Sequence, residues 1–223
     1  MDDKELLAVE NLEIWYGKVH ALSVDKLYLP KGRTLIIGPN ASGKTSLIKA
    51  ALGLIMPKRG KILVMGLDPI REASQLYEKV AYVPDNNPYP PGIKLSTLVR
   101  LLSETYGKER VYEVVEKLGL MDYLGKRLGD LSKGTARKAS LLSALVTSKD
   151  LVIIDEPFSG LDGKARNIVS GILGSRESSL IVISHIPLRI YFDYLIIIEA
   201  GKVSYIGEYR DPKELGYDLY TWT

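Results

Sequence analysis

The sequence predicts an α/β protein with a mainly parallel sheet, built around a phosphate-binding loop. Three observations favour this class. Short apolar runs of strand length recur at 34–37, 151–154 and 180–183, and they alternate with segments of helical spacing. The first of these runs leads directly into GPNASGKT, residues 38–45, which opens a helix. Between 86 and 148, helical segments follow one another without a strand, which predicts a helical insert.

Composition limits the possible functions. The 223 residues are 46% hydrophobic and 26% charged, which suits one globular domain, or one domain with an insert. A net charge of +3 is too small to argue for nucleic acid as a partner. The absence of cysteine excludes disulfides and thiolate sites and fits a reducing cytosol. No signal peptide is evident, and no apolar run approaches the roughly 20 residues that span a bilayer, so any membrane role would come through a partner.

Hydrophobic periodicity predicts the order of the elements. We expect strands at 6–17, 18–29, 34–38, 60–67, 79–84, 151–155, 179–184 and 194–203, the first of them in an N-terminal antiparallel β subdomain. We expect helices at 44–54, 96–107, 110–120 and 136–146. A single domain is predicted, with residues 1–85 as the first part of the core, 86–148 as the helical subdomain, and 149–223 as the second part of the core with a C-terminal tail.

The stretch GPNASGKT matches the phosphate-loop pattern of glycine, four residues, glycine, lysine and serine or threonine. Glycines at 38 and 43 allow backbone angles that turn successive N–H groups onto phosphate oxygens. Lysine adds a point charge, and threonine adds a hydroxyl for Mg²⁺. A chance match in a glycine-rich turn is the alternative, but the strand before and the helix after favour a phosphate-loop NTPase. The candidate phosphate-binding residues are Gly38, Pro39, Asn40, Ala41, Ser42, Gly43, Lys44 and Thr45.

Two carboxylates and a histidine follow buried strands. The run LVIIDEP places Asp155 at the end of a strand, where it can hold Mg²⁺, and Glu156 one residue beyond, where it can deprotonate an attacking water. Two solvated carboxylates that cap a strand are the alternative. His185 follows the strand at 179–184 and could reach a γ-phosphate, although an isolated histidine at a strand end is more often structural.

These pieces, in this order, resemble the nucleotide-binding domain of ATP-binding-cassette (ABC) ATPases over nearly the whole chain. LSKGT, residues 131–135, resembles the family's signature sequence, in which Ser132 and Gly134 carry the defining role. It stands upstream of LVIIDEP, and SGLD follows at 159–162, as the family requires. The resemblance implies the ABC ATPase fold, with the signature in the helical subdomain.

The resemblance also explains a second helix start that suits anions. In the family, two such domains dock head to tail, and the signature of each grips the γ-phosphate of the ATP held by the other. An ordinary N-capped helix is the alternative for LSKGT. The resemblance further implies that Tyr16 stacks on adenine while Trp15 packs, that Thr45 binds the metal, that Glu156 is the catalytic base, that His185 senses the γ-phosphate, and that Asp162 crosses the dimer seam.

The chain departs from the family pattern at three positions. Asp85 stands where the family usually has glutamine, and it is shorter and charged, although its oxygens can still ligate Mg²⁺. Lys133 and Thr135 replace glycine and glutamine of the commoner signature. The aspartate and the lysine both resemble exporter-type cassettes. The loop at 85–95 corresponds to the region beside the groove for a permease helix, or it is a connecting loop without a partner.

We therefore expect an ATPase subunit of an ABC transporter that uses ATP and Mg²⁺, with Lys44, Glu156 and His185 as catalytic residues. It would dimerise on ATP with a second ABC ATPase subunit and drive separate transmembrane permease subunits, with export favoured over import. It would be cytoplasmic and peripheral on the inner face of the membrane, with no nucleic-acid partner. The alternatives are a soluble ABC ATPase acting on ribosomes or DNA, and a phosphate-loop kinase of a small metabolite.

Overall fold

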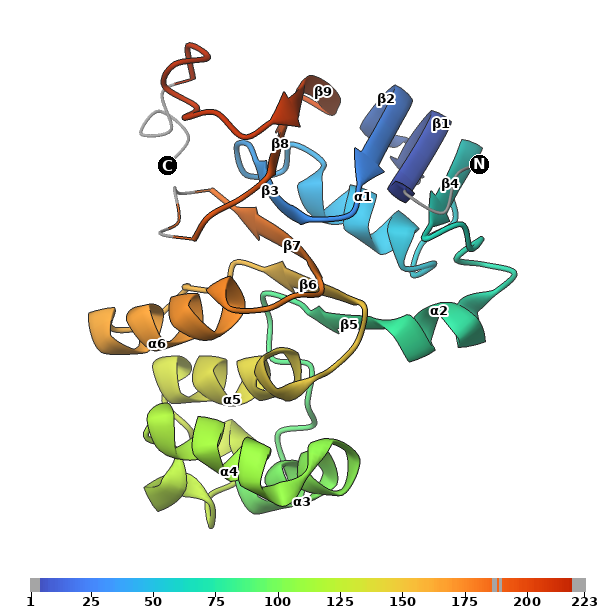
Figure 1. Ribbon diagram of the computed structural model, residues 1–223. Coiled ribbons are helices and arrows are strands. Elements are labelled where there is room, and N and C mark those ends of the chain that lie inside the picture. The colour runs from blue at the N-terminus through green and yellow to red at the C-terminus, as the bar shows by residue number, and fades with distance from the viewer. Residues whose placement is uncertain (1–4, 186–187, 189, 218–223) are drawn as a thin grey trace. The chain divides into compact units, whose positions relative to one another are not determined.

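The computed structural model describes residues 5–185, 188 and 190–217. Their contacts group them into two compact units (Figure 1). The first unit holds the described residues of Met1–Val80 and Ser179–Thr223, and the second unit is Ala81–Ser178. The predicted limits of the helical subdomain, 86–148, stay a prediction.

The first unit is built on a mixed sheet. Its strands follow one another in the order β4-β1-β2-β9-β8-β3-β7. They are β1 (Glu5–Tyr16), β2 (Val19–Pro30), β3 (Arg33–Ile37), β4 (Arg59–Val64), β7 (Ser179–Ser184), β8 (Tyr194–Glu199) and β9 (Lys202–Glu208). β1 pairs antiparallel with both β2 and β4, which confirms the antiparallel N-terminal part. Helix α1 (Lys44–Ala51) contacts these three strands and buries one of its faces against them (Figure 1).

The parallel part of this sheet has β3 between β7 and β8. Ile36 is opposite Ile183 on one side and Ile196 on the other, and all three are fully buried. The side chains of β7 are buried on both faces, as the unbroken apolar run in its sequence indicates. The mainly parallel α/β core is therefore confirmed.

The second unit is mostly helical. Its helices are α3 (Leu95–Tyr106), α4 (Lys108–Lys117), α5 (Lys133–Val146) and α6 (Gly163–Gly174), with short 3₁₀ turns at Met121–Tyr123 and Leu128–Asp130. α3 and α5 both pack against α4 (Figure 1). α3 buries Leu95, Leu98, Val99 and Leu102, the spacing of one helical face. Strands β5 (Val80–Val83) and β6 (Leu151–Asp155) are neighbours in the sheet.

Three elements differ from the sequence-based expectation. The single strand expected at 194–203 is wrong, because Ala200 and Gly201 take positive φ of 45° and 75° and turn the chain into the antiparallel hairpin β8–β9. α2 (Ala73–Lys79) was not expected, and it buries only Leu76. α6 was missed as well, although it buries Ala165, Val169 and Leu173 at a regular spacing of four.

No helix within the described ranges is both long enough and apolar enough to cross a membrane.

We expect Ile36→Ala to lower the free energy of unfolding by about 2–5 kcal/mol, because it leaves a cavity between three buried strands. Urea unfolding followed by circular dichroism measures the loss. Val19→Ala is the control, because Val19 is 67% exposed and its truncation should change stability by less than about 0.5 kcal/mol. Equal losses in the two variants would show that the β3 environment is not the packed centre of the unit.

Candidate functional site

The phosphate loop joins the end of β3 to the start of α1 and passes very close to neighbouring backbone. A Cβ added at Gly38 would lie 1.9 Å from the Ile198 carbonyl oxygen of β8. A Cβ added at Gly43, where φ is 110°, would lie 2.7 Å from the Ala21 carbonyl oxygen. No side chain fits at either position, so both glycines are required for the loop to lie against the sheet.

The lysine and a serine of the loop are held in a buried setting. Lys44 is 6% exposed, and its Nζ donates hydrogen bonds to the carbonyl oxygens of Gly38 at 2.8 Å and Pro39 at 2.7 Å. Its charge is therefore fixed at the loop. The Ser42 hydroxyl is buried and has no hydrogen-bond partner among the described residues. A buried cation and an unsatisfied hydroxyl in one glycine-rich loop are suited to a phosphate group.

A cavity of about 300 Å³ lies beside this loop. Loop residues from Ala41 to Ser46 line it together with Tyr16, Val19 and His20. Tyr16 is 44% exposed, and its hydroxyl accepts a hydrogen bond from the Ser46 hydroxyl at 3.4 Å. The structure thus brings the expected adenine-stacking residue next to the phosphate loop. An exposed aromatic ring beside an anion site can hold the base of a nucleotide.

Trp15 packs, as expected from its position next to Tyr16. Its ring lies against the His20 ring, with centroids 4.8 Å apart. The ammonium of Lys58 lies 4.4 Å from the centre of the indole.

His185 belongs to the same unit as the phosphate loop. It follows the last residue of β7 directly and is half-buried. The expected order of strand and histidine is therefore present.

The acidic residues belong to the second unit. β6 is buried along its length and ends at Asp155, which is 5% exposed. Glu156 follows with a φ of 50°, a left-handed conformation that is rare for a residue other than glycine. Its carbonyl oxygen accepts a hydrogen bond from the Ser159 N–H at 3.2 Å, which closes a turn. Strain of this kind in a half-buried glutamate is common at functional sites.

Asp85 lies just beyond β5, the strand next to β6, and is exposed. The carboxylates of Asp85, Asp155 and Glu156 all lie close enough to Arg137 to raise its pKa. The structure therefore brings together the three acidic residues expected to serve the metal and the water.

Arg137 of α5 lies among these carboxylates and was missed by the sequence analysis. It is 5% exposed. Its Nη1 donates to the carbonyl oxygens of Pro84 at 2.7 Å and Asp85 at 3.1 Å. Its Nη2 donates to the carbonyl oxygens of Asp155 and, at 2.8 Å, Glu156. The only signal in the sequence was that Arg137 falls on the apolar face of its predicted helix. A charged side chain in such a position needs a polar partner.

Burial dominates the electrostatics of this cluster. It lowers the pKa of Arg137, and the nearby carboxylates of Asp85, Asp155 and Glu156 oppose this shift. Burial also raises the pKa of Tyr82 to about 12, with a further contribution from the Asp155 carboxylate. Tyr82 is therefore neutral at physiological pH, and Arg137 supplies the cation of the cluster.

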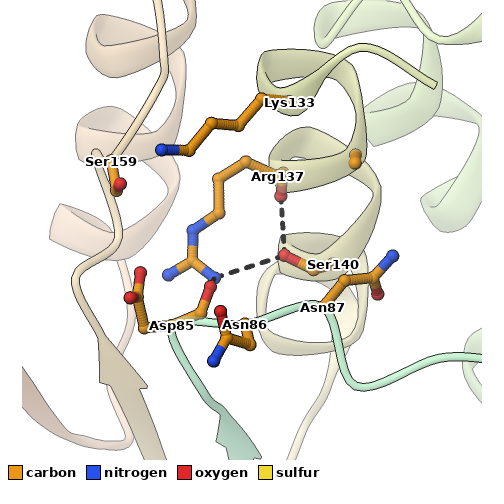
Figure 2. Close-up of a pocket in the computed structure, with 8 residues that line it drawn as sticks. Asp85, Asn86, Asn87, Lys133, Arg137, Ser140 and Ser159 are labelled. Atoms are coloured by element: carbon orange, nitrogen blue, oxygen red, sulfur yellow. Dashed lines mark hydrogen bonds between the residues drawn. The ribbon is translucent and has the colours of Figure 1, made fainter. Parts of the chain in front are cut away.

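A cavity of about 190 Å³ opens next to the guanidinium of Arg137. Figure 2 shows Arg137 between Asp85 and Ser140, with the Lys133 side chain extended toward Ser159. The cavity is lined by Asp85, Asn86, Asn87, Lys133, Ala136, Arg137, Ser140 and Ser159.

The signature segment forms the N-terminus of α5. Ser132 is the N-cap, and its Oγ accepts a hydrogen bond from the Thr135 N–H at 3.3 Å. Thr135, which replaces the usual glutamine, also pairs its hydroxyl with Ser132 Oγ at 2.8 Å. A Cβ added at Gly134 would lie 2.8 Å from the Gly160 carbonyl oxygen, so a glycine is required there. Ser132 itself is exposed, which leaves this helix start accessible.

Asp162 caps the next helix. Its Oδ1 accepts a hydrogen bond from the Ala165 N–H at 2.8 Å at the start of α6, and its Oδ2 lies 3.2 Å from Lys138 Nζ. The bond from Ala165 and the charge of Lys138 lower the pKa of Asp162. The SGLD turn is therefore tied to the signature helix through an ion pair.

Comparison with known proteins agrees with this set of features. The family model described as ABC transporter matches residues 22–159. An ABC transporter ATP-binding protein of Pyrococcus furiosus is 30% identical over 96% of this chain and 88% of its own length. The zinc import ATP-binding protein ZnuC of Wigglesworthia glossinidia brevipalpis is 29% identical over 82% of this chain and 77% of its own length. A solved ATP-binding subunit of an ABC transporter superposes with a TM-score of 0.81 at 24% identity, over 97% of each chain.

The comparisons do not support the expected direction of transport and do not favour one alternative. A relative named for import gives no support to the expectation of export. The alternative of an ABC ATPase for ribosomes or DNA is not favoured, because the relatives are named as subunits of transport systems. With its phosphate loop, its signature helix start and its family match over most of the chain, this protein belongs to the ATP-binding subunits of ABC transporters, which are ATPases.

Proposed function

We propose that this chain works as one of a pair of ABC ATPase subunits, which ATP brings together to drive separate permease subunits. The observation that carries the proposal is the presence of two helix starts suited to anions in one chain. One is the phosphate loop before α1, and the other is the exposed N-terminus of α5 with its Ser132 cap. A second such site is explained if it serves the ATP held by the other subunit.

In this proposal the phosphate loop holds the triphosphate of ATP. The N–H groups of residues 40–45 and the Ser42 hydroxyl donate hydrogen bonds, and Lys44 exchanges its bonds to the Gly38 and Pro39 carbonyls for phosphate oxygens. Tyr16 stacks on the adenine. The buried position of Lys44 strengthens its attraction for phosphate, because water screens the charge less than at an exposed site.

The oxygen donors of the chain fit Mg²⁺. Mg²⁺ is usually held by one or two carboxylates together with substrate phosphates. Thr45, Asp155 and Asp85 offer a hydroxyl and two carboxylates, and no group of three or more His, Cys, Asp and Glu side chains within the described ranges could hold a metal by itself. When bound, Mg²⁺ would neutralise charge on the phosphate oxygens.

Glu156 is proposed as the general base. Its carboxylate takes a proton from the water that attacks the γ-phosphorus, and His185 donates a hydrogen bond to the γ-phosphate. The left-handed backbone at Glu156 supports this role, because it costs free energy and must be held by its surroundings.

The signature supplies the link between the subunits. Ser132 and the N–H groups near Gly134 would bind the γ-phosphate of the ATP on the opposite subunit, and Asp162 would reach toward the same seam. Hydrolysis removes the γ-phosphate and hence these contacts, so the pair would open. The closed pair would then bind ATP more tightly than the open pair. A ligand can drive a conformational change only through such a difference in affinity.

Permease subunits would hold the pair at the inner face of the membrane, on the cytoplasmic side. This inference rests on the transport systems to which the relatives belong, and on the loop at 85–95 as the region for a permease helix.

We expect Glu156→Gln to abolish ATP hydrolysis while ATP binding is kept, because the amide keeps the shape of the side chain but accepts no proton. With ATP trapped at the seam, the variant should form a particle of twice the mass of the chain. Phosphate release and static light scattering with ATP and Mg²⁺ measure these effects. Hydrolysis at the normal rate would contradict the assignment of Glu156 as the base.

We expect Lys44→Ala to lose at least about tenfold in ATP affinity, because removing a buried charge from a phosphate contact costs more than about 1.4 kcal/mol. Binding of a fluorescent ATP analogue measures the change. Lys18→Ala is the matched control, because Lys18 is an exposed lysine next to the cavity residue Val19 and is outside the phosphate loop. Equal affinity of the two variants would rule out the phosphate-loop assignment.

A further inference from the structure

We propose that Arg137 is a positioning residue, which fixes the backbones of Asp85 and Glu156 together and links them to the signature helix. This inference rests on the proposed roles of Glu156 as base and of Ser132 and Gly134 in binding the ATP of the partner.

One nitrogen of Arg137 controls the conformation of Glu156. Nη2 donates to the carbonyl oxygens of Asp155 and Glu156, which belong to the two peptide groups on either side of the Glu156 Cα. Holding both peptide groups holds the φ and ψ angles between them. Glu156 is the residue that needs this support, because its φ of 50° is unfavourable without it. Arg137 thus sets the direction in which the Cα–Cβ bond of Glu156 leaves the backbone.

The other nitrogen does the same for Asp85. Nη1 donates to the carbonyl oxygens of Pro84 and Asp85, which flank the Asp85 Cα. A single guanidinium therefore holds the ends of two neighbouring strands, β5 and β6, at the residues proposed for metal and water. Figure 2 shows the guanidinium beside Asp85.

An arginine is required for this arrangement. The guanidinium is planar and presents two terminal nitrogens in a rigid fork, while lysine has one ammonium at the end of a flexible chain. The Nε of Arg137 is buried and has no hydrogen-bond partner among the described residues, so the two terminal nitrogens orient the group. Ser140 also lies within 3.4 Å of Nη1 and returns a bond of 2.9 Å to the Arg137 carbonyl, which further limits the side chain (Figure 2).

The position of Arg137 on α5 makes the link to the signature. Arg137 lies in the same helix as Gly134 and five residues after the Ser132 N-cap. A helix moves as a rigid element over such a short distance, so a shift of its N-terminus also moves the guanidinium. Contact of Ser132 with the ATP of one site would therefore change the backbone of Glu156, which serves the other site. The two ATP sites of the pair would be coupled through this residue.

A second arginine of the same unit gives a matched control. Arg176 is half-buried and also donates to main-chain carbonyls, those of Ala144 at 3.1 Å and Thr147 at 3.0 Å, at the C-terminal end of α5. Its role is to satisfy the last carbonyls of the helix. Replacing either arginine by lysine removes hydrogen bonds from a guanidinium to main-chain carbonyls. Only Arg137, however, holds the backbones of Asp85 and Glu156.

The experiment compares Arg137→Lys with Arg176→Lys in the full chain. We expect Arg137→Lys to lower kcat for ATP about 10- to 100-fold, because small misplacements of reacting groups have effects of that size. KM for ATP and the affinity for a fluorescent ATP analogue should stay within about twofold, since the phosphate loop is untouched. The Hill coefficient for ATP should fall toward one. Both variants should lower Tm, because each loses hydrogen bonds to main-chain carbonyls. Arg176→Lys should keep kcat and the Hill coefficient.

The possible outcomes separate this inference from the proposed function. If both lysine variants have a lower Tm and an unchanged kcat, Arg137 has only a structural role and the inference is overturned. Glu156→Gln, measured beside them, tests the proposed function on its own: normal hydrolysis in that variant overturns the function and the inference that rests on it. Lost hydrolysis in Glu156→Gln with normal kcat in Arg137→Lys overturns the inference alone.

Hydrogen exchange of the unmodified chain decides the question if Arg137→Lys does not fold. We expect a non-hydrolysable ATP analogue with Mg²⁺ to slow amide exchange in three segments at the same analogue concentration, 132–137, 85–87 and 156–159. Slower exchange in 132–137 with unchanged exchange in the other two segments would contradict the link.

Discussion

The close approach of the phosphate loop to the sheet is the constraint on which the first unit depends. At Gly38 the loop touches the backbone of β8, and at Gly43 it touches the backbone of β2, so neither position has room for a side chain. The loop is therefore fixed by main-chain contacts with two strands. Its lysine is in turn held by the carbonyls of the loop itself. The result is a loop whose backbone and buried lysine are both held in place.

In the second unit, a side chain rather than glycine fixes the backbone. Two neighbouring strands end close together, and one buried arginine donates hydrogen bonds to four main-chain carbonyls at these ends. The desolvation of this charge is costly, and hydrogen bonds from a charged group to the carbonyls offset it. In the first unit, glycines let the loop backbone touch the backbone of two strands. In the second unit, the Arg137 side chain connects the backbones of two strand ends. Both arrangements fix the backbone at positions next to charged side chains.

The signature helix carries three features close to its N-terminus. Its N-terminus is exposed at Ser132, its first turn contacts the backbone of Gly160 at Gly134, and its buried face carries Arg137. Asp162, two residues beyond Gly160, is paired with Lys138 of the same helix. A single rigid element thus contacts both the turn at 159–162 and the strand ends that carry the acidic residues.

The sequence by itself determined the class of the fold, the phosphate loop, the strand that ends at Asp155 and the N-capped signature helix. These features depend on short-range patterns, such as alternation, glycine spacing and capping, which are visible within about ten residues. Tertiary structure alone decided the main-chain carbonyls that Arg137 binds, which lie 18 to 53 residues away in the chain. It also decided the reason for glycine at position 38, which is the approach of Ile198. The hairpin of β8 and β9 is different, because its turn at Ala200 and Gly201 is a short-range feature that the sequence analysis overlooked. The contacts of Arg137 and Gly38 depend on which distant segments pack together, and the pattern within one segment does not identify its partner.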